Sequence, residues 1–180
     1  MITEVSTLTD IAFEVCTALD SAGFVGVLTG GSAATFHAPE AYQSKDLDFV
    51  LTLRGKGGER ALEAIGFHRN GAFYLHDRTH FTLDFPSGPL GVGDELVTTW
   101  DTERRRGRPP MVLHVLSPTD SCRDRLASFL FWNDFAGLEQ ALHVATAKPT
   151  QVDLELIRDW CGREGQTKKF EIFAARLQQR

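Results

Sequence analysis

The chain has 180 residues, of which 42% are hydrophobic and 24% are charged, and this composition is typical of a soluble globular protein. A chain of this length forms one domain, or one catalytic domain with a short appendage. The 19 Lys and Arg residues against 24 Asp and Glu residues give a formal net charge of −5, which excludes a general nucleic-acid binder with an overall positive field.

The first third of the chain predicts a helix, a strand, a glycine turn and a second strand. Apolar residues recur every three or four positions over residues 7–19, which indicates an amphipathic helix. Residues 24–28 are short and apolar, so we expect a strand that leads into the turn at 29–32 and then a short helix over 33–36. Residues 46–52 alternate between acidic and apolar side chains, which predicts a strand with one buried face.

The next segments predict a helix, a hairpin and two further strands. Residues 57–65 have a helical pattern, and residues 72–76 and 79–85 are two β-prone arms joined by a tight turn. Further strands are expected at 96–100 and 111–116. Two loops accompany them, a glycine- and proline-rich loop at 86–93 and a strongly basic loop at 103–110.

The pattern becomes purely helical at Ser117, where Ser117 as N-cap and Pro118 at the first helical position open a helix. Helices are predicted over residues 117–132, 135–145, 152–161 and 167–177. The chain therefore divides into a core of residues 1–116, with both strands and helices, and a helical C-terminal subdomain of residues 117–180.

Three features of the core suit chemistry, although each one alone also has a purely structural interpretation. Gly30, Gly31 and Ser32 form a turn whose backbone can approach a ligand closely, and its amides and hydroxyl suit a phosphate group. Asp46 and Asp48 share one face of a strand, so that both carboxylates can reach the same divalent ions.

The third feature is Asp84, an isolated acid inside a later apolar strand, on the face opposite to Leu83 and Phe85. A third carboxylate would complete a cage for two magnesium ions, which can activate an attacking oxygen and stabilise a departing pyrophosphate. The structural alternatives are a solvated polar face of the sheet and an ordinary turn between a strand and a helix.

In this order, Gly31-Ser32, Asp46-Leu47-Asp48 and Leu83-Asp84-Phe85 resemble the signature of the DNA polymerase β-like nucleotidyltransferase superfamily. The runs GGSAATFH and YQSKDLDFVL are similar to small bacterial members related to the abortive-infection and toxin–antitoxin nucleotidyltransferases. The resemblance implies an α+β nucleotidyltransferase fold, a mixed β-sheet with helices packed on it and a C-terminal helical subdomain. It also implies an enzyme that transfers a nucleoside monophosphate from an NTP to a hydroxyl acceptor.

The resemblance implies a role for each motif residue. The nucleotide-binding residues are Gly30, Gly31 and Ser32. The catalytic residues, which also bind the metal, are Asp46, Asp48 and Asp84. The cofactor is Mg²⁺ or Mn²⁺, the nucleoside triphosphate is a substrate, and the acceptor is an RNA, a protein or a small molecule that the sequence does not identify.

Several charged residues have two interpretations. The segment between Ser32 and Asp46 contains no Arg. If the γ-phosphate needs a cation there, either Lys45 supplies it or the site is weakened, and alternation points Lys45 away from the acids, as a solvated or ion-paired lysine. The run Arg104, Arg105, Arg106 and Arg108 is either a solvated loop or a binding site for RNA or nucleotide phosphates. The charged residues 123–125 either pair across the helical core or face the cleft.

Two alternatives to an active enzyme stay open. One is a catalytically silent nucleotide-binding or regulatory module, and the other is a component of a toxin–antitoxin pair that acts with a partner protein encoded nearby. The cysteines are odd in number and widely spaced, which argues against a disulfide framework and against structural zinc. Because the sequence shows no export signal and no stretch near 18 apolar residues, we expect a cytoplasmic protein without a membrane partner.

Overall fold

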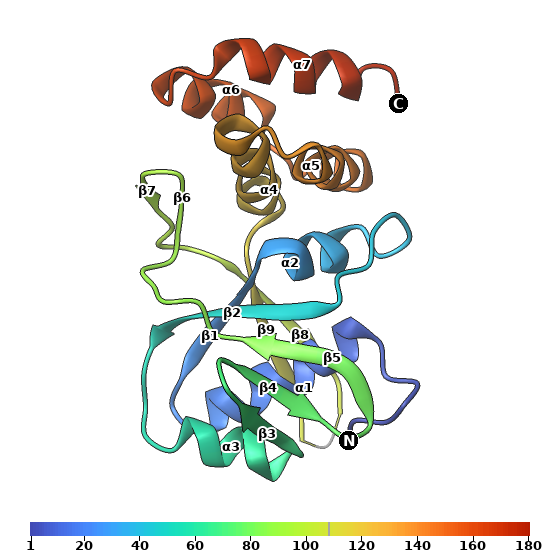
Figure 1. Cartoon of the computed structure of the whole chain (residues 1–180), viewed down its shortest axis with the longest axis vertical. Coiled ribbons are helices and arrows are strands. Elements are labelled where there is room, and N and C mark those ends of the chain that lie inside the picture. Colours follow the sequence, from blue (N-terminus) through green and yellow to red (C-terminus); the bar gives the residue numbers. More distant parts are fainter. Residues whose placement is uncertain (108) are drawn as a thin grey trace.

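The computed structural model describes residues 1–107 and 109–180, so that Arg108 of the basic run lies outside the described residues. Within them, seven strands form one sheet in the order β3-β4-β5-β2-β1-β9-β8, and β6 and β7 form a separate ribbon (Figure 1). The strands are β1 Val25–Thr29, β2 Asp46–Leu53, β3 Phe67–Asn70, β4 Phe73–His76, β5 Thr79–Asp84, β6 Gly91–Val92, β7 Glu95–Leu96, β8 Asp101–Arg105 and β9 Met111–Val115. The helices are α1 Leu8–Ser21, α2 Gly30–His37, α3 Gly58–Ala64, α4 Pro118–Trp132, α5 Phe135–Ala147, α6 Leu154–Arg163 and α7 Thr167–Leu177.

The sheet is mixed. Strand β1 pairs in parallel with β9, and β2 pairs in parallel with β5, whereas the other neighbouring strands are antiparallel. Four helices, α4 to α7, follow the last strand. The predicted architecture, a mixed sheet with helices packed on it followed by a C-terminal helical region, is therefore confirmed.

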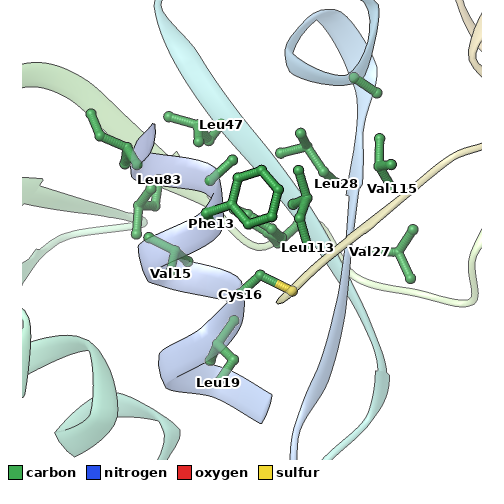
Figure 2. Close-up of a cluster of buried hydrophobic side chains, with 14 of the residues drawn as sticks. Phe13, Val15, Cys16, Leu19, Val27, Leu28, Leu47, Leu83, Leu113 and Val115 are labelled. Atoms are coloured by element: carbon green, nitrogen blue, oxygen red, sulfur yellow. The ribbon is translucent and has the colours of Figure 1, made fainter. Parts of the chain in front are cut away.

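Helix α1 covers one face of the sheet, and its start and its apolar stripe are both encoded locally. Thr7 and Asp10 form a capping box, in which the Thr7 hydroxyl accepts from the N–H of Asp10 and the Asp10 carboxylate accepts from the N–H of Thr7. Phe13 and Leu19 of the stripe pack against the central strands (Figure 2). Each such side chain contributes about 1.5–3 kcal/mol to stability when it is fully buried.

The strands that carry the acidic motifs have two different faces. Leu47 and Leu83 are fully buried and belong to the cluster beneath α1 (Figure 2). Because side chains alternate along a strand, Asp46, Asp48 and Asp84 project from the opposite face. Helix α2 and the C-terminal helices lie beyond that face (Figure 1).

A second apolar cluster joins the C-terminal helices to α2 and to the ribbon of β6 and β7. Its largest fully buried side chains include Trp160 and Phe173, and it also contains Ala34 of α2 and Val92 of β6. Helices α4 and α5 therefore pack onto α2, and α4 also packs onto β6 of the ribbon. The division of the chain into residues 1–116 and residues 117–180 as separate units stays a prediction.

Three local expectations are corrected by the structure. Strand β8 occupies part of the expected basic loop, where it pairs antiparallel with β9 as an edge strand of the sheet. Of the strand expected at 96–100 only Leu96 lies in a strand, as the second residue of β7, and β3 is a strand that the sequence pattern does not predict. Helix α2 begins at Gly30, three residues before its expected start.

The cysteines are free and buried, and burial raises the pKa of the Cys16 thiol to about 11, so that it stays protonated at neutral pH. In the described part of the chain, no helix has the length and apolar character needed to cross a membrane.

Candidate functional site

The sheet register places two of the motif acids directly opposite each other. In the parallel pair of β2 and β5, Asp48 is the partner of Asp84, and Asp46 is the partner of Thr82. Neighbouring strands lie about 4.8 Å apart, and Asp46 and Asp48 lie about 6.5–7 Å apart along β2. The structure therefore brings the three predicted acids to one face of the sheet, at the place where β5 ends.

The glycine turn lies against the same acids. Strand β1 ends at Thr29, and Gly30 has a φ of +63°, a left-handed conformation that favours glycine. A Cβ atom on Gly30 would lie 2.5 Å from Oδ2 of Asp48. The absence of a side chain at this position therefore allows the Asp48 carboxylate to lie against the first residue of α2.

The other two residues of the turn are buried, and Ser32 is engaged inside the protein. The Ser32 hydroxyl donates to the carbonyl oxygen of Thr29 at 2.7 Å and accepts from the N–H of Asp48 at 3.2 Å. Gly31 lies so close to Ser44 that a Cβ atom on the glycine would be 3.2 Å from the Ser44 hydroxyl oxygen. The observed contacts of Ser32 join the turn to β2, and a phosphate would have to compete with the Thr29 carbonyl for its proton.

The outer two acids are held by short local hydrogen bonds. Asp46 is exposed, and its Oδ1 accepts from the Ser44 hydroxyl at 2.8 Å. Asp84 is half-buried, and its Oδ1 accepts from the N–H of Phe85 at 2.8 Å. The second oxygen of each of these carboxylates accepts no hydrogen bond from the residues that the structure describes.

Asp48 is the electrostatic centre of the site. Burial, and to a smaller extent the neighbouring charges of Asp46 and Asp84, raise its pKa from the ordinary value of 3.8 to about 6, whereas Arg125 acts in the opposite direction. Within residues 1–107 and 109–180, no Lys, Arg or His nitrogen lies within 4.0 Å of a carboxylate oxygen of these three acids. The acidic cluster is therefore not neutralised by a direct ion pair.

A pocket of about 380 Å³ opens beside Asp48. Its walls come from the sheet and α2, from the segment after β5, and from helix α4. The lining residues are Thr29, Gly30, Asp48, Val50, Pro86, Ser87, Pro89, Leu90, Gly91, Asp124 and Arg125. The C-terminal helical region thus contributes two charged residues, Asp124 and Arg125, to the pocket that Asp48 lines.

Arg125 is the cation that the sequence motifs do not reveal. Its Nε and Nη2 donate to Oδ2 of Asp124 at 2.9 and 2.7 Å, and its Nη1 donates to Gln140 at 3.5 Å. Of the two interpretations of residues 123–125, the pocket-facing one holds for Asp124 and Arg125, whereas Arg123 forms ion pairs elsewhere in the helical region. Lys45, the cation expected from the sequence, is exposed.

The three acids suit a divalent cation in donor type but not in their present arrangement. Carboxylate oxygens are the ligands that Mg²⁺ prefers, and the raised pKa of Asp48 shows that a positive charge beside it would be favourable. However, in the described part of the chain, no three or more His, Cys, Asp and Glu side chains are arranged to hold a metal ion. Binding a cation would therefore require their carboxylates to rotate toward one another.

Comparison of the sequence with protein-family models and with curated proteins finds no match. Among solved structures, the chain is similar to the antibiotic-resistance factor ANT(2'')-Ia, whose solution structure is described as revealing substrate-regulated conformation dynamics. The sequence identity is 16%, the match covers 96% of this chain and 95% of that chain, and the TM-score is 0.48. The likeness spans nearly the whole of both chains, but its TM-score is too low to carry an argument about activity.

Proposed function

We propose that this protein is a metal-dependent nucleotidyltransferase, which transfers a nucleoside monophosphate from an NTP to a hydroxyl acceptor. The observation that carries the proposal is the meeting of three motifs around Asp48, which lines the pocket. Asp48 is in register with Asp84, and its carboxylate lies against the left-handed Gly30 at the start of α2. Each motif alone is common, but an ordinary polar sheet face does not require an unpaired acidic cluster beside a glycine turn.

The negative charge of the site can be matched by bound cations. Asp46, Asp48 and Asp84 would hold Mg²⁺ or Mn²⁺, which when bound would neutralise the triphosphate and favour departure of pyrophosphate. The chain's own contribution is then to orient the nucleotide. Much of the acceleration in phosphoryl transfer comes from such positioning and charge neutralisation.

The remaining groups of the pocket have complementary tasks in this proposal. The backbone amides of Gly30 and Gly31 at the start of α2 would bind phosphate oxygens, because the N-terminus of a helix attracts anions. Arg125 would exchange part of its contact with Asp124 for a phosphate oxygen. Asp84, at the end of β5, would accept the proton of the acceptor hydroxyl.

One rival function is favoured by a specific observation. The described residues contain no ready-made group of three metal ligands, which suits a module that binds a nucleotide without catalysis. Two measurements separate this rival from the enzyme. The rival binds a non-hydrolysable NTP and transfers nothing, whereas the enzyme binds the analogue and labels an acceptor when it is given the NTP itself.

The experiment is to incubate the protein with each labelled NTP, Mg²⁺ or Mn²⁺, and a cell extract that supplies RNA, protein and small-molecule acceptors. An Asp46→Ala/Asp48→Ala variant is the test, and Asp159→Ala is the control, because Asp159 is an exposed acid of α6 paired only with Arg158. We expect labelling by the parent and the control only. Labelling by the double variant equal to that by the parent protein would refute the enzyme proposal.

The acceptor and a protein partner are separate questions. The size and polarity of the pocket do not distinguish an RNA, a protein or a small-molecule hydroxyl, and the labelled product identifies the class directly. A partner protein encoded nearby stays a prediction, which copurification of the two gene products tests.

A further inference from the structure

A segment of the chain that belongs to no motif forms one wall of the pocket. We call residues 86–97 the arm; it follows β5 and contains β6 and β7 (Figure 1). Five of its first six residues line the pocket, namely Pro86, Ser87, Pro89, Leu90 and Gly91. Leu90 is also buried in the apolar cluster beneath α1. Val92 is buried in the cluster of the C-terminal helices. The arm therefore bridges the two apolar clusters beside the acids.

The arm is fastened to the C-terminal helices by one carboxylate. Glu95 accepts from Nη2 of Arg123 at 2.5 Å, and from Nη2 and Nε of Arg163 at 2.7 and 3.1 Å. Hydrogen bonds from Arg163 and Arg123 lower the pKa of Glu95, which keeps it charged. Arg123 is buried, also pairs with Asp120 at 2.9 Å and lies 4.8 Å from the centre of the Trp160 ring.

The tip of the arm is pressed against α6. Gly93 has a φ of +59°, and a Cβ atom on it would lie 2.8 Å from Oε1 of Glu164 and 3.2 Å from the Trp160 ring. The N–H of Asp94 donates to the same Glu164 oxygen at 3.4 Å. The tip thus has little freedom to move toward α6, and the ion pairs of Glu95 oppose its movement away.

The arm and the pocket depend on the same helix. Arg123 directly precedes Asp124 and Arg125 in α4, and these two residues form the pocket wall that faces the sheet. Holding Glu95 on Arg123 therefore fixes the distance between two walls of the pocket, one formed by α4 and the other by the start of the arm.

We propose that Glu95 is a positioning residue, which holds the arm against α4 and α6 and thereby sets the width of the pocket that receives the nucleotide. The kinetic part of this inference rests on the proposed function, whereas the fastening of the arm does not. Glu95 itself touches neither the acids nor the glycine turn, so its effect on the reaction is transmitted through the arm.

The test compares Glu95→Gln with Glu139→Gln. Glu139 is a matched control, because its carboxylate also lies between two arginines, Arg176 at 2.5 Å and Arg180, but it joins α5 to α7 away from the arm. Hydrogen exchange of the arm amides reports on the fastening, and KM and kcat for the NTP report on the pocket. Loss of hydrogen bonds between charged groups predicts exchange about 10- to 100-fold faster in the arm of Glu95→Gln.

The expected result is faster exchange confined to the arm and an NTP KM raised at least about tenfold, with kcat changed by less than about threefold. The control should match the parent protein in both measurements. Unchanged exchange in the arm overturns the inference, and so does a loosened arm with an unchanged KM.

Two further outcomes are distinguished by design. If the parent protein transfers nothing from any NTP, the proposed function fails, and hydrogen exchange alone decides whether Glu95 fastens the arm. If Glu95→Gln does not fold, Arg163→Gln takes its place. The Arg163 side chain is 59% exposed, and its substitution removes the ion pair with Glu95 while the pair between Arg123 and Glu95 stays. A smaller change of the same sign is then expected, and no change in the arm overturns the inference.

Discussion

The contact between Gly30 and Asp48 can be tested by adding a single methyl group. In Gly30→Ala the new Cβ would lie 2.5 Å from Oδ2 of Asp48, so the carboxylate must retreat by about 0.5 Å to restore the 3.0 Å below which such contacts essentially never occur. The retreat turns Asp48 away from its rotamer, at about 0.5–1.5 kcal/mol. The left-handed backbone adds about 1–2 kcal/mol for a residue with a side chain.

The chain offers a matched control for the backbone contribution. Gly71, in the turn between β3 and β4, also has a φ of +63°, but a Cβ atom on it would meet nothing within 4 Å. Gly71→Ala should therefore lower the free energy of unfolding by about 1–2 kcal/mol, and Gly30→Ala by about 1.5–3.5 kcal/mol. For a protein of this size each kcal/mol lowers Tm by about 2–4 °C.

The assays are chemical denaturation and nucleotide transfer. We expect Gly30→Ala to lose most of its activity and Gly71→Ala to retain it, because only the first substitution displaces Asp48. Adding Asp48→Ala to Gly30→Ala should remove the extra destabilisation, since the contacting oxygen is then absent. Equal losses of stability in the two glycine variants, with full activity in Gly30→Ala, would refute the reasoning.

Three further substitutions at or beside the pocket test the charge of Asp48, the catalytic role of Asp84 and the contribution of Ser32 to stability. The pKa of Asp48 is raised in the folded protein, so the free energy of unfolding of the parent relative to Asp48→Asn should fall by at most about 3 kcal/mol as pH rises from about 4 to about 6. Chemical denaturation that gives the same difference between parent and variant at every pH in this range would contradict the shift. Asp84→Asn should abolish transfer and leave Tm unchanged or higher. The amide oxygen can still accept from the N–H of Phe85, and a negative charge beside Asp46 and Asp48 is lost. Retained turnover in the labelling assay counts against a role for Asp84. Ser32→Ala should lower the free energy of unfolding by about 1–3 kcal/mol, because the partly buried N–H of Asp48 loses its acceptor. Denaturation with an unchanged midpoint would show that this hydrogen bond is dispensable.

The acidic face of the site follows from the sequence, but its assembly does not. Alternation along residues 46–52 predicts that Asp46 and Asp48 share a face, because side chains alternate in any strand. That Asp84 lies beside Asp48 depends on the parallel pairing of β2 with β5, two strands separated by a helix and two other strands. No local pattern specifies such a register, so the sequence supports it only through the order of the motifs.

Strands β3 and β8, which the sequence pattern does not predict, have charged sequences for a physical reason. Strand β8 contains Glu103, Arg104 and Arg105, and the sequence of β3 is Phe-His-Arg-Asn. Both are edge strands of the sheet, where charged side chains remain in solvent and discourage pairing with other chains. Their backbone hydrogen bonds come from a neighbouring strand, so a periodic apolar pattern is not needed and the sequence signal disappears.

Helix α4 explains why the cationic part of the site escapes motif analysis. Three consecutive residues, Arg123, Asp124 and Arg125, point in different directions around the helix, so that the first holds the arm and the other two face the acids. A sequence run cannot reveal this division, because it arises only when α4 packs between the arm, α2 and the sheet. The boundary expected at residue 116 would leave the three acids on one side and Arg125 on the other. The pocket beside Asp48 is therefore lined by both parts of the chain, and we expect substitutions in the helical region that shift α4 to affect the pocket as directly as substitutions in the sheet.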